Sequence, residues 1–372
     1  MESIKTLNYH MEALALHEFH HGLNATFTEV NGMEVVGRYG DFISEYRALH
    51  ESAGVLDLSF RSRLCLTGAD RVRFLHGQVT NNVQTLRGGE GVYAALVTAK
   101  GKLQSDLNIY TLQNELLLDF EPGLAKTVSE RLENYIIADD VQIIDVATAY
   151  GLLSVQGPKS ENVVRSVGLN LETPGKPMSF GSVNDANLGE IYLMNHPRTG
   201  GIGFDLFVPA PALGAVLDKL IAAAKEQGGR ACSWEALEVA RIEAGIPRFG
   251  IDMDEGNLAP EAIEQRAISY SKGCYIGQEV IARIRTYGQV AKVLRGLRLA
   301  NDLKNLPQRG DKLFHEDKEV GYLTSIAASP SLKANVALGY VRKEANQLGT
   351  GLMVRSTDGD SAAQIVALPF QP

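Results

Sequence analysis

Residues 272–279 read KGCYIGQE, a stretch in which Lys272, Gly273, Cys274 and Gly277 stand close together in the sequence. Gly273 and Gly277 allow the backbone to turn sharply or to approach a ligand closely. Lys272 lies two residues before Cys274, where its positive charge can favour the thiolate form of the cysteine. The segment therefore predicts a functional loop in which Cys274 acts chemically. A tight turn in which Cys274 is a small buried hydrophobic residue is the alternative, and the residues alone leave both open.

The end of this segment suits the recognition of a flat heterocycle. Gln278 carries an amide and Glu279 a carboxylate, which together can bond the donor and acceptor groups along a ring edge. A run of basic residues follows, made up of Arg283, Arg285, Lys292, Arg295 and Arg298. If they gather in space, these cations would attract an anionic group. Scattered, solvated charges are the alternative.

Two acidic residues further upstream fall in segments that alternate like strands. Residues 103–110 place Asp106 on a polar face, opposite a face of leucine and isoleucine. Asp205 is out of phase with its apolar neighbours Phe204 and Leu206. A carboxylate in such a position can guide a proton or bond a ligand nitrogen. The competing interpretation is an ordinary exposed aspartate on a strand.

Hydrophobic periodicity divides the chain into a mixed part and an all-β part. Residues 63–145 combine strand patterns with helical ones and include a hairpin across Gln113-Asn114. Residues 147–290 repeat this mixture. After residue 291, short apolar segments alternate with turn residues, which predicts a small antiparallel β barrel or sandwich. The chain is therefore expected to be an α+β protein with a β domain at its end.

Two helices are predicted in the second half of the mixed part. The apolar residues of 213–224 recur at helical spacing, and the helix is expected to stop at Gly228-Gly229. A second helix should start after Ser233, a good N-cap, and end at Gly245. Trp234, the only tryptophan, is expected in the core at the start of this helix.

Composition and charge argue against several classes of protein. The 372 residues carry a net charge of −8, which is poorly suited to non-specific nucleic-acid binding. Three widely spaced cysteines give neither a disulfide framework nor a zinc motif. No stretch approaches the ~18 apolar residues of a membrane span. We therefore expect a cytoplasmic protein without a membrane partner.

His17, His20 and His21 share a helix face, where a solvated surface is favoured over a metal site.

Several segments together resemble the YgfZ-type proteins, which belong with the glycine-cleavage T-protein (aminomethyltransferase) superfamily. KGCYIGQE is similar at every position to the K-G-C-[FY]-x-G-Q-E signature of the YgfZ type. The segments that resemble the wider superfamily are AGVLDLSFRSRLCLTG (53–68), GQVTNNV (77–83), RTGGIGFDLFVP (198–209), RIEAGIPRFGID (241–252) and GYLTSIAASPSLKANVALGYV (321–341). The resemblance covers roughly residues 45–345.

This resemblance implies a fold and a ligand. The expected fold is an α+β cloverleaf, in which two α+β domains surround a central folate cavity and a C-terminal antiparallel β barrel completes the molecule. Residues 1–62 and 146–290 would form a discontinuous folate-binding domain, 63–145 an inserted α+β domain, and 291–372 the barrel. The implied cofactor is tetrahydrofolate or another reduced folate.

The resemblance also implies roles for individual residues. Asp205 matches a glutamate that contacts the pterin ring in the family, and Asp106 matches the second acid of the T-protein motif GGxxDD. The residues expected to bind the cofactor are Asp205, Asp106, Tyr275, Gln278, Glu279, Arg283 and Lys272. Those expected to be catalytic are Cys274 and Asp106. The basic run that begins at Arg283 is expected to attract the polyglutamate tail of a folate.

Two departures from the T-protein bear on function. The chain has KGCYIG where the T-protein has KGDFIG, and Ser105 replaces one of the two acids. These departures favour a folate-binding accessory protein for iron–sulfur cluster assembly or repair. Its expected partners are iron–sulfur client or assembly proteins, and the expected state is a monomer. A tetrahydrofolate-dependent aminomethyltransferase or demethylase is an alternative that Asp106 keeps open. A tRNA-modification helper that uses the basic run is a further alternative.

Overall fold

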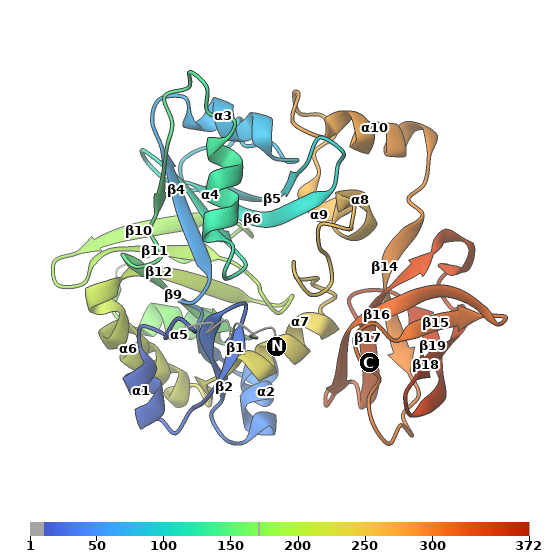
Figure 1. Ribbon diagram of the computed structural model, residues 1–372. Coiled ribbons are helices and arrows are strands. Elements are labelled where there is room, and N and C mark those ends of the chain that lie inside the picture. The colour runs from blue at the N-terminus through green and yellow to red at the C-terminus, as the bar shows by residue number, and fades with distance from the viewer. Residues whose placement is uncertain (1–10, 170–171, 372) are drawn as a thin grey trace, which may run out of the picture.

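The computed structural model describes residues 11–169 and 172–371, and most of its strands form two antiparallel sheets and one barrel (Figure 1). The first sheet has six strands in the order β10-β11-β12-β9-β3-β13, and only the pairing of β13 with β3 is parallel. Its strands are β3 (Gly54–Asp57), β9 (Tyr150–Gln156), β10 (Phe180–Asp185), β11 (Gly189–Asn195), β12 (Gly203–Pro209) and β13 (Arg230–Ala231). This sheet therefore draws strands from both sides of residues 63–145.

Helices cover both faces of the first sheet. On one face, α5 (Ser160–Ser166) and α6 (Leu213–Glu226) close a core of valine, leucine and isoleucine. The helix predicted over 213–224 is thus confirmed, and Gly228 follows it with φ +79°. The second predicted helix is α7 (Trp234–Glu243), which packs against α2 (Phe42–Glu51) in a second core. The Ser233 hydroxyl makes no capping hydrogen bond, contrary to expectation, although its backbone N–H donates to Glu45.

The N-terminal segment extends this second core. It comprises α1 (His17–Gly22) and the hairpin β1 (Thr26–Val30) and β2 (Met33–Arg38). The expectation of a solvated histidine face is wrong for His20, which is buried with its Nε2 atom 2.9 Å from Asp57 and its Nδ1 atom 2.6 Å from the Tyr39 hydroxyl. Among the described residues, no cluster of three or more histidine, cysteine or acidic side chains could hold a metal ion.

The second sheet has five antiparallel strands in the order β5-β6-β7-β4-β8. The strands are β4 (Ser62–Thr67), β5 (Gly91–Val97), β6 (Leu103–Thr111), β7 (Leu116–Phe120) and β8 (Gln142–Asp145). Helices α3 (Arg71–Gln78) and α4 (Ala125–Glu133) cover one face and share a leucine-rich core with it. The hairpin predicted across Gln113-Asn114 is confirmed by the pairing of β6 with β7.

Three helices connect the sheets to the barrel. They are α8 (Ala259–Ala262), α9 (Glu264–Ala267) and α10 (Gln278–Tyr287), and they pack on β5 and β6 through a small separate core. Figure 1 shows α8 and α9 between the second sheet and the barrel. No helix in the described part of the chain is long and apolar enough to cross a membrane.

The C-terminal strands close into an antiparallel barrel, as predicted. They run in the order β14-β17-β16-β15-β18-β19 around an interior of leucine, valine and alanine. Their bounds are β14 (Lys292–Leu299), β15 (Lys312–His315), β16 (Lys318–Ser329), β17 (Ala334–Arg342), β18 (Gly351–Ser356) and β19 (Gly359–Val366). For the whole chain we propose the domain division 1–62 with 146–290, 63–145, and 291–372. The sheets are consistent with this division, although β4 begins at Ser62.

Candidate functional site

A cavity of about 340 Å³ lies where the two sheets, α7 and α9 meet, and we call it the inner cavity. Asp106 and Asn108 reach it from β6, Tyr93 from β5 and Arg266 from α9. Its further charged or aromatic lining residues are Arg61, Glu121, His196, Arg198, Trp234, Glu238, Arg241 and Arg248. Its volume is in the usual range for a small-molecule site. Because its walls come from distant parts of the sequence, only the folded chain assembles it.

Asp106 is the acid in this cavity with an unused hydrogen-bonding atom. Its Oδ2 atom accepts a hydrogen bond of 2.8 Å from the Tyr93 hydroxyl, whereas its Oδ1 atom is buried and has no partner among the described residues. Burial, together with the negative charge of Glu121, raises the pKa of Asp106 to about 6. An acid with a pKa near neutrality and one free oxygen can accept a proton from a bound molecule and return it.

Apart from Asp106 and Arg266, the charged side chains named around the cavity are paired among the described residues. Arg61 donates to Asp119 and to Glu121, each at 2.8 Å, and Arg248 donates to Glu121 at 2.7 Å. Arg198 donates to Asp119 at 3.0 Å. Although burial favours the neutral acid, Arg248 and Arg61 hold the pKa of Glu121 down to about 2. The result is a rigid network of satisfied ion pairs around a single under-used carboxylate.

Asp205 belongs to this network, so the alternative of an exposed strand aspartate is wrong for it. It is fully buried, and both its oxygens accept hydrogen bonds from Nε of Arg198, at 3.1 and 2.9 Å. His196 is 3.3 Å from the same carboxylate. Arg198 and His196 line the inner cavity, whereas Asp205 does not. The expected direct contact between Asp205 and a ligand is therefore not supported, and Arg198 takes its place at the cavity wall.

The segment 272–279 lies outside the inner cavity. Lys272 is buried, and its Nζ atom donates to the backbone oxygens of His76 and Val79 at 2.5 and 2.6 Å. Burial lowers the pKa of Lys272 to about 8. This lysine therefore holds the end of α3 and is not placed to bind a ligand in the cavity. Cys274 is exposed, so the alternative in which it is a small buried hydrophobic residue is wrong.

The other residues predicted from this segment also stand apart from the cavity. Tyr275 packs with the core under α8–α10, and the side chains of Glu279 and Arg283 are exposed. Gly277 caps α10 with φ +82°, and a Cβ atom there would meet the oxygen of Thr98 at 2.6 Å. Glycine is thus required because α10 docks closely on the β5–β6 turn. Gln278 follows it as the first residue of α10 and does not line the cavity.

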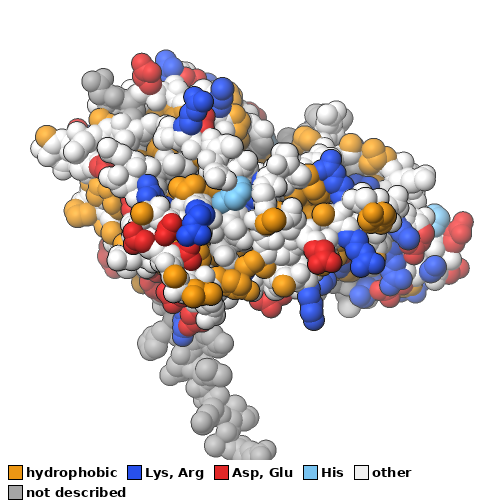
Figure 2. All heavy atoms as spheres, turned by 90° about the horizontal axis from the view of Figure 1, so that it is seen from above, with side chains coloured by type: hydrophobic (Ala, Val, Ile, Leu, Met, Phe, Trp, Pro, Cys, Tyr) orange, Lys and Arg blue, Asp and Glu red, His pale blue; other side chains and the backbone are white. Residues whose placement is uncertain are grey.

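The basic run does not form one cluster. Arg283 and Arg285 lie on α10, where Arg285 stacks on the Tyr270 ring at 3.9 Å. Arg295 and Arg298 lie on β14 and donate to the backbone oxygens of Asn346 and Gln371. Figure 2 shows one face of the molecule, on which basic side chains are interspersed with acidic and apolar ones. Because Arg285, Arg295 and Arg298 make contacts with different parts of the fold, the alternative of scattered charges describes this run better.

The sequence patterns missed most of the cavity wall. Trp234 lines the cavity, where Arg248 lies over its ring at 4.3 Å, and is therefore more than a core residue. Arg198 and Arg248 lie in the segments RTGGIGFDLFVP and RIEAGIPRFGID. These segments were used to recognise the family resemblance, but neither arginine was predicted to be a site residue. Tyr93, on β5, was not among the predicted site residues. The arginines inside otherwise apolar segments were the sequence signal that could have indicated these cavity residues.

The architecture defines a class of protein with two sheets around a polar cavity and a separate β barrel. A family model described as the GCVT N-terminal domain matches residues 16–272, and one described as the glycine cleavage T-protein C-terminal barrel domain matches residues 292–371. The chain belongs to the glycine cleavage T-protein family. The fold expected from the resemblance is thereby confirmed. The narrower resemblance to the YgfZ type stays a prediction.

Relatives cover almost the whole chain. An aminomethyltransferase of Halalkalibacterium halodurans is 28% identical over 346 residues, covering 92% of this chain and 93% of the relative. One of Symbiobacterium thermophilum is 27% identical over 375 residues, with 98% of each covered. The crystal structure of glycine cleavage system aminomethyltransferase T from Bartonella henselae matches with a TM-score of 0.88 at 22% identity, covering 97% of this chain and 98% of that one. This structural likeness concerns the fold.

Proposed function

We propose that this protein transfers the one-carbon unit of an aminomethyl donor, as a methylene group, to a reduced folate held in the inner cavity. Membership of the T-protein family supports a reduced folate in general terms, and the relatives named aminomethyltransferase support this reaction over an accessory role. The observation that carries the proposal is the Oδ1 atom of Asp106, which is buried in the cavity and has no hydrogen-bond partner among the residues that the structure describes.

The residues present fit a folate. The cavity offers the flat ring of Trp234, a second ring at Tyr93, and arginines with nearby carboxylates that suit the polar edge of a pterin. When bound, tetrahydrofolate supplies two nucleophilic nitrogens that take the one-carbon unit as a methylene bridge, while ammonia and the carrier leave and no electrons are gained or lost. Protons must therefore leave the folate nitrogens as the new C–N bonds form.

Asp106 is placed to take one of these protons. Tyr93 fixes one oxygen of the carboxylate, which leaves the other directed to a ligand. The ion pairs of Arg61, Glu121 and Arg248 hold the surrounding wall in place without competing for Asp106. With a pKa of about 6, Asp106 is mostly a carboxylate at neutral pH and still basic enough to accept a proton.

The test combines folate binding with transfer from an aminomethyl donor. Calorimetry should detect tetrahydrofolate binding, and the wild-type transfer rate should fall as pH drops through about 6. Asp106→Asn should lower the rate by about 10²-fold or more, because it removes the base, while changing the affinity far less. Glu279→Gln, on exposed α10, is the matched control and should leave both unchanged. Absence of binding by folded wild-type protein, or full activity of Asp106→Asn, would refute the proposal.

A second candidate is the folate-binding accessory role in iron–sulfur cluster assembly or repair. The observation in its favour is that the Cys274 thiol is exposed, whereas Cys65 and Cys232 are buried. A strain that lacks the gene provides the test, with iron–sulfur enzyme activity as the readout. Cys274→Ser should fail to restore that activity while the purified variant still binds folate. Full restoration by Cys274→Ser would remove the only support that the cysteine gives to this role.

A further inference from the structure

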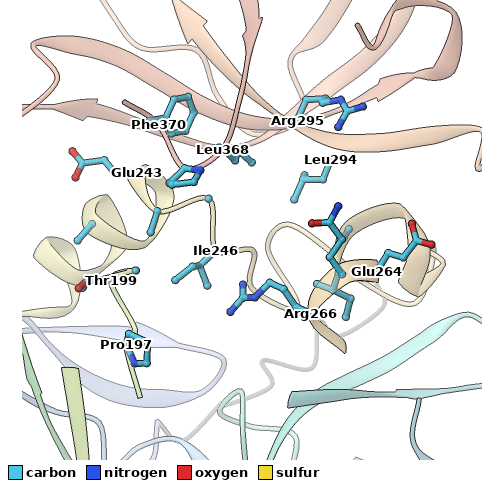
Figure 3. Close-up of a pocket in the computed structure, with 18 of the residues that line it drawn as sticks. Pro197, Thr199, Glu243, Ile246, Glu264, Arg266, Leu294, Arg295, Leu368 and Phe370 are labelled. Atoms are coloured by element: carbon cyan, nitrogen blue, oxygen red, sulfur yellow. The ribbon is translucent and has the colours of Figure 1, made fainter. Parts of the chain in front are cut away.

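The inner cavity adjoins a second and larger one. This outer cavity, of about 1020 Å³, lies between the end of α7, the helices α8 and α9, and the barrel strand β14. Figure 3 shows the barrel residues Leu294 and Phe370 on one side of it and Ile246 and Arg266 on the other. Pro197, Ile246 and Arg266 line both cavities. A ligand seated in the inner cavity can therefore extend past these residues into the outer one.

Within the described part of the chain, Arg266 is the arginine that lines both cavities, and Figure 3 shows its guanidinium directed toward the side of Ile246 and Pro197, where the two cavities join. Within the described residues, no carboxylate lies within ion-pair distance of it. The nearby Glu264 points away in Figure 3 and accepts a hydrogen bond of 2.6 Å from Tyr270. The inner-cavity arginines 61, 198, 241 and 248 are each paired with acids. Arg266 thus keeps donors that the fold itself does not use.

The position of Arg266 relative to Asp106 is set by Tyr93. The guanidinium carbon of Arg266 lies 5.3 Å from the centre of the Tyr93 ring, and the hydroxyl of the same ring donates to Asp106. The cation therefore lies over the ring whose hydroxyl holds the acid. A guanidinium with free donors is the preferred partner of a carboxylate in proteins, because both are planar and can bond in two places.

We propose that Arg266 binds a carboxylate of the reactants and thereby sets how far they extend from Asp106 into the outer cavity. This proposal rests on the proposed function. The carboxylate has two possible sources, namely the glutamate of the folate and an acidic group on the aminomethyl donor. In both cases Arg266 discriminates in favour of an anionic reactant over its neutral analogue, because only the anion can form a charge-assisted, two-point contact with the guanidinium.

The first arm of the test compares two folates by calorimetry. Tetrahydrofolate carries the glutamate, and tetrahydropteroate lacks it. If the glutamate is the source, Arg266→Gln weakens tetrahydrofolate binding about tenfold or more and tetrahydropteroate binding less than threefold. Arg283→Gln, an exposed arginine on α10 that lines neither cavity, is the control and leaves both affinities unchanged.

The second arm compares (aminomethylthio)acetate with its amide as donors. If the donor is the source, Arg266→Gln raises KM for the acid about tenfold, leaves KM for the amide unchanged, and alters neither folate affinity. Equal weakening of both folates, or no selective effect in either arm, overturns the proposal while wild-type folate binding still upholds the proposed function. If the folded wild-type protein binds neither folate, both fall together. Because Arg266 is exposed, its replacement should not impair folding.

Discussion

At the scale of single residues, two aspartates of the second sheet show how surroundings decide chemistry. Asp106 and Asp119 lie on the neighbouring strands β6 and β7. Burial and the charge of Glu121 raise the pKa of Asp106. Asp119 is buried too, but Arg61 and Arg198 hold its pKa well below its ordinary value. One carboxylate is thus poised to exchange a proton near neutral pH, and the other serves as a permanent charge.

This contrast predicts opposite effects on stability. The pKa of Asp106 is higher in the folded than in the unfolded state, so the free energy of unfolding falls as pH rises through about 6. Asp106→Asn should therefore stabilise the protein at pH 7 by roughly 1–3 kcal/mol, and this gain should shrink as pH approaches 5. Asp119→Asn should cost about 3–5 kcal/mol, because it leaves two arginines underpaired. Urea unfolding at both pH values measures this, and a destabilised Asp106→Asn would contradict it.

At the scale of elements, one buried carboxylate joins helix α7 to the barrel. Asp252 accepts a hydrogen bond of 2.6 Å from Arg241 of α7. It also accepts hydrogen bonds of 2.6 Å from the hydroxyls of Thr324 and Ser325 on β16. Arg241 itself donates to the Ser325 hydroxyl at 2.8 Å. The barrel is thus held to the helix that carries Trp234 and Glu238 into the inner cavity.

Removing this carboxylate should loosen the junction. Asp252→Ala leaves Arg241 without its closest acid and two hydroxyls without their acceptor, so we expect a loss of about 3–5 kcal/mol in the free energy of unfolding. Asp254→Ala, two residues away in an exposed turn, should change it by no more than about 0.5 kcal/mol. Denaturant titration compares the two. Equal effects of the two changes would show that the junction does not depend on Asp252.

At the scale of the whole molecule, the inner cavity couples ligand binding to global stability. Its walls come from the second sheet, from loops that adjoin strands of the first sheet, and from α7 and α9, so a ligand there contacts segments that separate on unfolding. Trp234, the only tryptophan, lies in this wall and serves as an internal reporter. A ring bound against the indole would change the fluorescence of Trp234. Because the protein has no other tryptophan, this change reports on the inner cavity alone.

We therefore expect tetrahydrofolate both to quench Trp234 fluorescence and to raise the urea midpoint. At a ligand concentration one hundred times Kd, the free energy of unfolding should increase by about 2.7 kcal/mol. Fluorescence-detected unfolding with and without ligand measures both effects. A midpoint that does not respond to saturating tetrahydrofolate, in protein that unfolds cooperatively, would show that the ligand does not bind the folded state preferentially.

The sequence by itself determined the local architecture. The spacing of apolar residues placed α6, Ser233 and Gly245 placed α7, the alternation around Gln113-Asn114 placed the β6–β7 hairpin, and the short segments after residue 291 placed the barrel. These features depend on neighbours within a few residues, which a linear pattern contains. The resemblance to the glycine cleavage T-protein family is confirmed, whereas the narrower YgfZ type stays a prediction.

Only the tertiary structure decided which polar residues share a site. Asp106 was found by its alternation and does line the inner cavity, but Asp205 lies behind Arg198, and the segment 272–279 docks on α3 and the β5–β6 turn instead. A strand pattern records that a side chain leaves one face of a sheet, not what covers the other face. Whether a carboxylate meets a ligand or an arginine depends on residues tens to hundreds of positions away, such as Arg61 for Asp119 and Arg248 for Glu121, and that partnership is fixed only when the chain has folded.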